Sequence, residues 1–141
     1  MKKSALFLIP IFFIGCGQKQ DSDWEKSKPK SLSGKITILP ELQAKVAPTD
    51  VIFVMAKGES GPPVAVKRIK MGAFPIEYTL TEEEDLMLPG MVFPERLNVT
   101  ARIDKDGNAA PPQPGDLGGE YAQNPAPVGS SNIDIEINRL Y

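Results

Sequence analysis

The stretch VIFVMA at residues 51–56 is apolar on both faces. Successive side chains of a strand point to opposite sides, so this pattern predicts a central strand that is buried on both sides. Five further segments indicate strands, most of them alternating between apolar and polar residues. They are LSGKITI at 32–38, VAVKRI at 64–69, IEYTL at 76–80, LNVTARI at 97–103 and IDIEIN at 133–138, the clearest alternation of all.

Turn-forming residues separate these segments. The chain has 14 prolines and 12 glycines, which argues for many turns and against a helical bundle. Residues 40–46 are long enough for one helical turn, and nowhere does a helical period last for three turns. We expect residues 110–129, which are rich in proline and glycine, to be irregular. The sequence therefore predicts an all-β domain, a sandwich or a barrel.

The first residues have the order of a bacterial lipoprotein signal. Lys2 and Lys3 precede an apolar run at 5–14, and the sequence Phe-Ile-Gly-Cys then ends at Cys16. By this resemblance, residues 1–15 are a signal peptide and the Cys16 thiol carries a lipid with acyl chains such as palmitate. We expect residues 16–31, which are polar, to be a flexible tether, and residues 32–141 to be the folded domain.

This anchor predicts a protein of the bacterial cell envelope, held on the periplasmic side of a membrane. The apolar run is too short for a transmembrane helix, which needs about 20 apolar residues. Gly17 follows the cysteine where an aspartate would mark retention. This resembles an outer-membrane address, so we expect the outer membrane rather than the inner one. More than one acyl chain would make the anchoring stable.

Composition excludes several classes of function. There is no histidine, and the one cysteine, Cys16, is assigned to lipid. Serine–histidine catalysis, thiolate zinc, iron–sulfur and haem sites are therefore ruled out. The formal net charge is −2 and no basic stripe is visible, so nucleic acid is a poor partner. We expect no enzyme, no catalytic residue, no metal and no cofactor.

Two polar clusters keep a carboxylate or calcium alternative open. Asp104, Asp106 and Asn108 have the spacing that opens an EF-hand loop, but its later positions hold Ala109 and Gly115 instead of glycine and glutamate. A hairpin turn explains this pattern as well. The acidic run at 82–85 could do acid–base work only in a cleft. A solvated turn is the simpler interpretation.

The apolar loop LMLPGMVF at 86–93 is the candidate binding surface. Methionines adapt to varied apolar partners, and an exposed apolar patch marks a binding site. We expect Met87, Met91 and Phe93 to contact a partner protein. The alternative is that these residues plug one end of the sandwich.

Several motifs, in order along the chain, resemble one known family. The most specific are Ala-Arg-Ile at 101–103, Gly-Asn-Ala at 107–109 and Pro-Gln-Pro-Gly-Asp-Leu at 112–117. Residues 44–57, 61–66 and 87–91 add to them. The match is to the Ig-like periplasmic domain of cytochrome c-type biogenesis protein H (CcmI or CycH), and spans roughly residues 32–137. The resemblance implies an Ig-like antiparallel β-sandwich.

In that family the domain belongs to a membrane protein that holds apocytochrome c and presents it for haem ligation. The resemblance implies a membrane-anchored binding module, an accessory in cytochrome c maturation that holds apocytochrome c. A lipid anchor would replace the family's transmembrane helices and tetratricopeptide region. The alternative is a structural or scaffold lipoprotein that docks to a larger envelope or respiratory complex.

Overall fold

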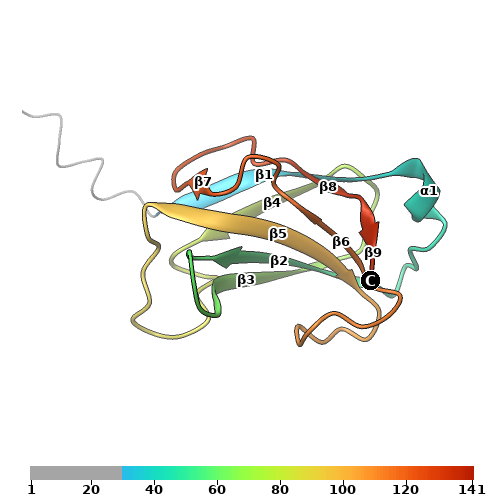
Figure 1. Ribbon diagram of the computed structural model, residues 1–141, viewed down its shortest axis with the longest axis horizontal. Helices are drawn as coiled ribbons and strands as arrows, with labels where there is room; N and C mark the ends of the chain where they lie inside the picture. The colour runs from blue at the N-terminus through green and yellow to red at the C-terminus, as the bar shows by residue number, and fades with distance from the viewer. Residues whose placement is uncertain (1–29) are drawn as a thin grey trace, which may run out of the picture.

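Two β-sheets pack face to face in the computed structural model, which describes residues 30–141 (Figure 1). The smaller sheet has the strand order β4-β1-β8 and the larger has β3-β2-β5-β6-β9, with β7 paired to β5. The elements are β1 (Ser31–Ile38), α1 (Pro40–Gln43), β2 (Val51–Lys57), β3 (Pro63–Lys70), β4 (Ile76–Thr81), β5 (Arg96–Asp104), β6 (Leu117–Glu120), β7 (Ala126–Pro127), β8 (Ile135–Ile137) and β9 (Arg139–Leu140). This arrangement confirms the predicted all-β sandwich.

Strand β2 lies inside the larger sheet, as its apolar pattern predicts. It pairs antiparallel with β3 on one side and β5 on the other, and Ile52 stands opposite both Ile69 and Ile103. Its inner face is fully buried, and on its outer face Phe53 is also covered. The apolar residues on both faces of β2 thus correspond to side chains that are buried on both sides of the sheet.

The alternating segments each send one face into the core between the sheets. In β4, Tyr78 and Leu80 are buried while Glu77 and Thr79 are exposed. The same alternation holds in the last strand region. The buried core includes Leu32, Ile36, Ile52, Val54, Leu80, Leu97, Val99, Ile103, Leu117, Ile133, Ile135 and Ile137. Each fully buried side chain of this size stabilises the fold by about 1.5–3 kcal/mol of transfer free energy.

The expectation of an irregular segment at 110–129 is wrong at two places. Residues 117–120 form β6, which pairs with β5, and residues 126–127 form β7. Gly118 and Gly119 lie inside β6, and glycine inside a strand weakens the sequence signal. The structure shows why glycine stands there. A Cβ on Gly119 would come within 2.0 Å of the Glu136 carbonyl oxygen.

Strand β8 closes one side of the sandwich and is the exception to antiparallel pairing. It runs parallel to β1, with Ile36 opposite Ile135. The chain just before it crosses so close to β1 that a Cβ on Gly34 would lie 2.1 Å from the Ile133 carbonyl oxygen. An isolated bridge from Tyr121 to Ile135 links this segment to the region of β6. The two glycines therefore let β8 lie between the sheets' edges.

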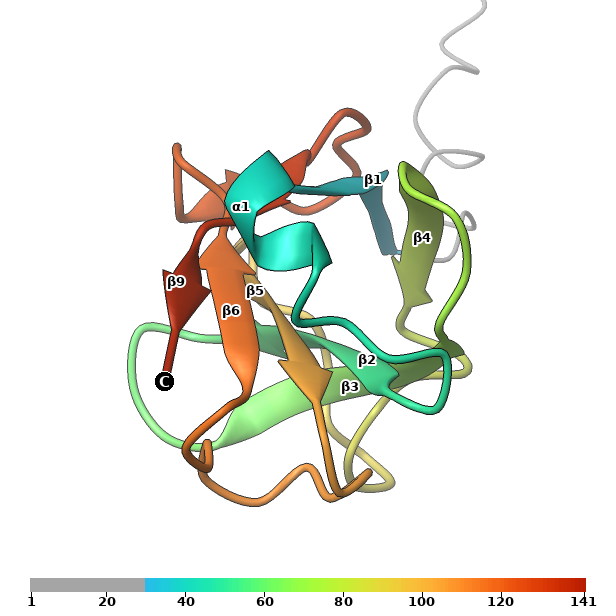
Figure 2. The same ribbon diagram turned by 90° about the vertical axis from the view of Figure 1, so that its right-hand side faces the viewer.

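The two ends of the sandwich are built differently. The described chain begins at the left-hand end in Figure 1, where β1 starts, while α1 and the C-terminus lie at the right-hand end. Figure 2 looks onto this right-hand end and shows α1 lying across the top of the sandwich. Proline at the first turn of α1 suits a short helix, and Leu42 anchors it in the core.

Candidate binding site

Residues 44–50, between α1 and β2, form one wall of a pocket at the α1 end. The Asp50 carboxylate holds this segment in place. Its Oδ2 accepts a 2.7 Å hydrogen bond from the Ala47 N–H and lies 2.6 Å from the Lys105 ammonium. Lys105 also donates to the Lys45 carbonyl. Asp50 is 4% exposed, so this buried carboxylate has the partners that it needs.

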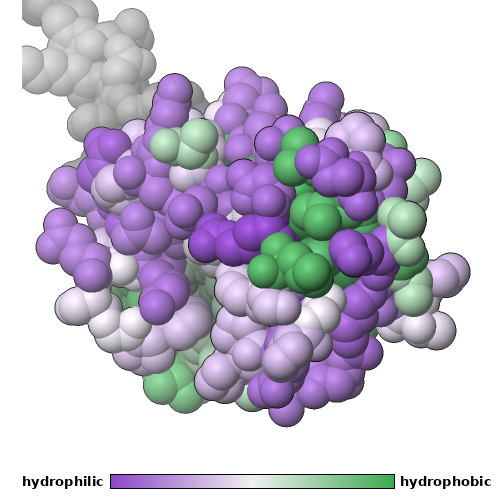
Figure 3. All heavy atoms as spheres, turned by 45° about the vertical axis from the view of Figure 1, so that its right-hand side comes forward, coloured by the Kyte–Doolittle hydropathy of each residue, from purple (hydrophilic) through white to green (hydrophobic). Residues whose placement is uncertain are grey.

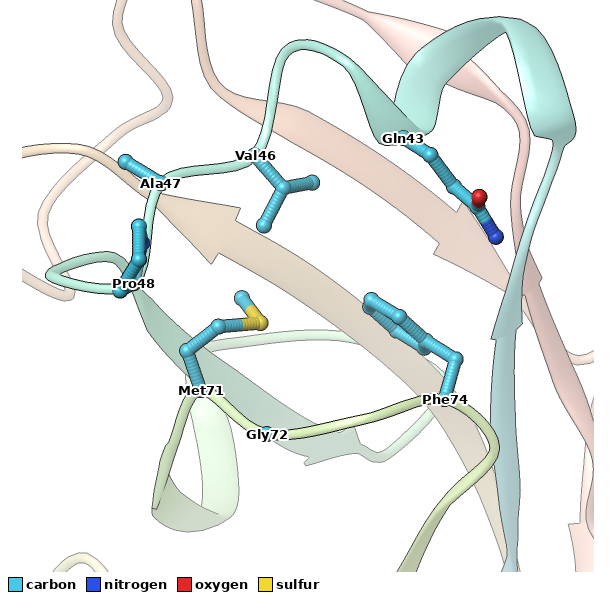
Figure 4. A pocket seen from close by; sticks show the side chains of 7 residues that line it. All are labelled: Gln43, Val46, Ala47, Pro48, Met71, Gly72 and Phe74. Carbon is cyan, nitrogen blue, oxygen red and sulfur yellow. The ribbon is translucent and has the colours of Figure 1, made fainter.

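The opposite wall is the connection from β3 to β4. Met71 and Phe74 lie in it, both half-buried and packed against the core. Figure 4 shows their side chains rising toward Val46, which points down from the first wall. The side chain of Gln43 reaches in from α1. Two segments that are distant in the sequence, residues 43–48 and residues 71–74, thus meet at this end of the sandwich.

The pocket between these walls is apolar and open, with a volume of about 440 Å³. It is lined by Gln43, Val46, Ala47, Pro48, Met71, Gly72 and Phe74. Figure 3 shows apolar surface gathered between polar areas on the side of the molecule that carries α1. The amide of Gln43 is the one polar side-chain group among these lining residues, and none of them is ionisable. Such a pocket suits an apolar side chain of a partner and provides no acid, base or nucleophile.

The candidate loop 86–93 lies at the opposite end, between β4 and β5. Met87 is 50% exposed, and Met91 is half-buried. Phe93 is 1% exposed, so the expectation that it contacts a partner is not compatible with its place in the core. Its N–H donates to Glu82 and its carbonyl accepts from Lys30, which secures it there. Phe93 therefore fits the alternative given for this loop, that its residues close one end of the sandwich.

Beside Phe93, the loop leaves a small apolar surface. Leu88 and Val92 are 60% and 64% exposed, and together with Met87 they form what we call the loop patch. This patch lies at the end where the described chain begins, because the Lys30 ammonium donates a 2.7 Å hydrogen bond to the Phe93 carbonyl. A partner-binding role for Met87 and Met91 stays a prediction.

The acidic run at 82–85 is a turn whose carboxylates serve the backbone. Asp85 accepts a 2.7 Å hydrogen bond from the Thr81 N–H, and its two oxygens each lie 3.3 Å from the Lys67 ammonium. Glu83 and Glu84 are exposed. Glu83 and Glu84 thus fit a solvated turn, while Asp85 is buried at 9% exposure and Glu82 is half-buried, because their carboxylates bind backbone N–H groups.

The Asp104–Asn108 segment is a bend at the start of the connection from β5 to β6, and it is not a tight hairpin because β6 begins only at Leu117. Asp104 Oδ1 accepts hydrogen bonds from the N–H groups of Asp106 and Asn108, and Asp106 Oδ1 accepts a second one from Asn108. Asp104 also pairs with Arg102 at 3.1 Å. Within residues 30–141, no group of three or more carboxylate, histidine or cysteine side chains could hold a metal ion.

The predicted lipidation site, Cys16, and the tether up to residue 29 lie outside the described residues. So does the predicted signal peptide. Within the part of the chain that the structure describes, no helix has the length and apolar character needed to cross a membrane.

Sequence reasoning missed the pocket at the α1 end. Val46 ends the segment expected to allow one helical turn, and Met71 and Phe74 are single apolar residues between two predicted strands, in a stretch with no predicted structure. A signal was present in Met-Gly-Ala-Phe-Pro at 71–75, an apolar connection much like the loop at 86–93. Which of the two stays open and which plugs the core depends on contacts that the chain order does not show.

The two packed sheets, with β2 inside the larger one, define an Ig-like β-sandwich domain. The Ig-like domain of cytochrome c-type biogenesis protein H matches residues 32–138 as a family. The chain belongs to this family, and the match includes both walls of the pocket and the loop patch.

Two relatives and one solved structure are similar to the chain. An uncharacterized protein of Aquifex aeolicus (strain VF5) is 32% identical over 120 residues, 83% of this chain and 76% of the relative. The cytochrome c-type biogenesis protein CycH of Pseudomonas aeruginosa is 33% identical over 84 residues, 56% of this chain and 20% of that protein. An alternative pilotin from the type II secretion system of Vibrio cholerae aligns with a TM-score of 0.45 and 15% identity over 79% of this chain and 99% of that chain, a likeness too distant to bear on function.

Proposed function

We propose that this protein is a non-enzymatic binding module of cytochrome c biogenesis that holds a segment of apocytochrome c. Family membership across residues 32–138 supports the biological setting. The relative from Pseudomonas aeruginosa carries that process in its name. Because the chain spans 20% of that relative, the proposal concerns the Ig-like domain and not the other activities of the longer protein.

The apolar pocket at the α1 end is the observation that carries a binding role. An unfolded or helical segment presents apolar side chains that a folded cytochrome covers, and a pocket of this volume takes one or two of them. The absence of histidine from the chain and of ionisable side chains from the pocket lining supports a role without catalysis.

The predicted lipid anchor would fit this role. We propose that Cys16 holds the protein on the periplasmic side of the bacterial envelope, with the tether and the loop patch toward the membrane. The pocket would then face away from the lipid, because it lies at the opposite end of the sandwich from the start of β1.

The test is a titration of the full-length protein, purified in mild detergent, with labelled apocytochrome c and with the same cytochrome carrying haem. Fluorescence anisotropy reports binding. We expect the protein to bind the apo form and not the holo form. Equal binding of both forms, or of neither, would contradict the proposal. Deletion of the gene should also lower the amount of haem-stained c-type cytochromes in membranes.

The loop patch favours a second candidate, a scaffold lipoprotein that docks to a larger envelope complex. Met87, Leu88 and Val92 form an exposed apolar surface that a stable partner would cover. A complex that co-purifies in detergent and persists when haem supply is blocked would support this function. It would also count against a role restricted to apocytochrome c.

A further inference from the structure

Strand β3 lies at the edge of the larger sheet, and a short segment of the chain already covers the first half of that edge. The Val66 N–H donates to the Asp85 carbonyl at 3.0 Å, and the Met87 N–H donates to the Val64 carbonyl at 3.0 Å. In an antiparallel strand the N–H and C=O of one residue point to the same side, and successive residues alternate. The backbone N–H and C=O groups of the even-numbered residues of β3 therefore point away from β2, toward the outer edge of the sheet.

The second half of this edge is uncovered. By the same alternation, the backbone groups of Arg68 and Lys70 point away from β2. The backbone hydrogen bonds among residues 30–141 give them no partner on that side. A row of such groups at a sheet edge is a template for a further strand. We call residues 67–70 the open edge of β3.

The segment that covers the first half shows which chemistry this edge accepts. It is an acidic residue followed by an apolar one. Asp85 pairs with Lys67 of β3, with 3.3 Å between the carboxylate oxygens and the ammonium. Leu86 forms an isolated bridge with Ala65 and packs against the core. An acidic, apolar stretch in extended form thus already pairs with β3.

The charges beside the open edge are positive. Arg68 and Lys70 are exposed, and neither forms an ion pair with another described residue. The nearby carboxylate of Asp50 is already committed to Lys105. An acidic side chain of an incoming strand would therefore meet uncompensated positive charge.

The open edge is continuous with the apolar pocket. Met71 of the pocket wall directly follows Lys70, the last residue of β3. A second hollow, about 530 Å³ in volume, lies over the adjoining face of the sheet, between the start of β2 and Arg68 and Lys70 of β3. It shares Pro48 and Met71 with the apolar pocket. An extended segment that pairs with β3 beyond residue 66 is thus led directly to the apolar walls at the α1 end.

We propose that the open edge of β3 binds an extended segment of the partner protein by strand addition, and that this segment alternates acidic and apolar residues. Main-chain hydrogen bonds to Arg68 and Lys70 supply affinity. Acidic side chains pair with the two exposed cations, and an apolar side chain at the end enters the pocket of Val46, Met71 and Phe74. This mode of binding rests on the binding-module function proposed above.

The probe is a short fluorescein-labelled peptide of alternating leucine and glutamate, with a leucine–lysine peptide as its counterpart. Both are titrated against the full-length protein in detergent. The Arg68→Pro variant removes the outward N–H without removing a bond to β2. Its matched control is Thr79→Pro in β4. The Glu82 N–H donates to the Lys30 carbonyl just before β1, so even-numbered residues of β4 bond toward β1 and the Thr79 N–H points away from it. The Lys70→Glu variant is matched by Lys57→Glu, an exposed lysine outside the open edge.

We expect the glutamate peptide to bind and the lysine peptide not to bind. Arg68→Pro should weaken binding at least about tenfold, because it removes both the outward N–H and one of the two cations, and Lys70→Glu should weaken it as well. The two control variants should bind like the wild type. Amide exchange at residues 68 and 70 should slow when the peptide is bound.

Wild-type binding by both Arg68→Pro and Lys70→Glu, or equal binding of the two peptides, would overturn strand addition. Apocytochrome c in the same titrations separates this inference from the proposed function. If apocytochrome c binds every variant equally well, the proposed function is supported and strand addition at the open edge is refuted. A protein that binds the glutamate peptide through the open edge but not apocytochrome c keeps the edge and refutes the function.

Discussion

Tyr78 shows how one polar atom is accommodated in the core. The residue is 4% exposed, and its hydroxyl donates a 2.6 Å hydrogen bond to the Ile133 carbonyl. Burial raises the pKa of the Tyr78 hydroxyl, and the nearby Asp134 carboxylate raises it further. This hydroxyl links β4 to the segment before β8 and stays protonated in the folded protein above the pH at which a free tyrosine ionises.

The raised pKa of Tyr78 makes stability fall at high pH. The folded state keeps a proton that the unfolded chain loses above about pH 10, so the contribution is fully present below that pH and is lost as pH rises above it. We expect the Tyr78→Phe substitution to lower the free energy of unfolding by about 1–2 kcal/mol at neutral pH. The difference from the wild type should shrink above pH 10. Urea unfolding at a series of pH values measures both, and a constant difference would contradict the assignment.

Gly119 is a position where the backbone itself leaves no room for a side chain. Gly119→Ala places a Cβ 2.0 Å from the Glu136 carbonyl oxygen, so β8 must move. We expect the free energy of unfolding to fall by at least about 2 kcal/mol. Gly58→Ala is the control, because its nearest contact would be 3.8 Å away. Similar urea midpoints for the two variants would show that β8 yields easily.

At the scale of elements, the connection from α1 to β2 depends on Asp50. Asp50→Ala leaves the Ala47 N–H and the Lys105 ammonium without their shared acceptor. We expect a loss of about 1–3 kcal/mol in the free energy of unfolding. Thermal and urea unfolding measure it, with Asp106→Ala as the control, an exposed carboxylate that accepts a single backbone bond. A loss no larger than in the control would mean that the connection keeps its shape without Asp50.

At the scale of the whole molecule, two apolar surfaces lie at opposite ends, and they predict different binding sites. Met71→Glu places a charge in the pocket wall, while Met87→Glu makes the same change in the loop patch. If the pocket holds the partner, Met71→Glu should weaken binding of apocytochrome c at least about tenfold, and Met87→Glu should leave it unchanged. Anisotropy titration of both variants measures this. The reverse pattern would move the site to the loop.

Much of the fold follows from the sequence because alternation and turn residues act locally. The segments at 51–56, 97–103 and 133–138 each bury the face that their pattern predicts. Strand β6 was not predicted, because Gly118 and Gly119 have no side chains and so give no alternation of apolar and polar residues. Both glycines nevertheless pair with β5. Side chains would not fit at these two positions, because the Tyr141 ring lies over Gly118 and β8 lies over Gly119.

Composition and alternation alone indicate the all-β class, the central position of β2 and the exclusion of histidine-based chemistry, since they need no knowledge of distant contacts. The burial of Phe93 in the core and the pocket formed by Val46, Met71 and Phe74 follow only from how distant segments pack together. The open edge of β3 is likewise a tertiary result. Whether an apolar loop residue is buried depends on what packs over it, and here that cover comes from segments far away in the chain.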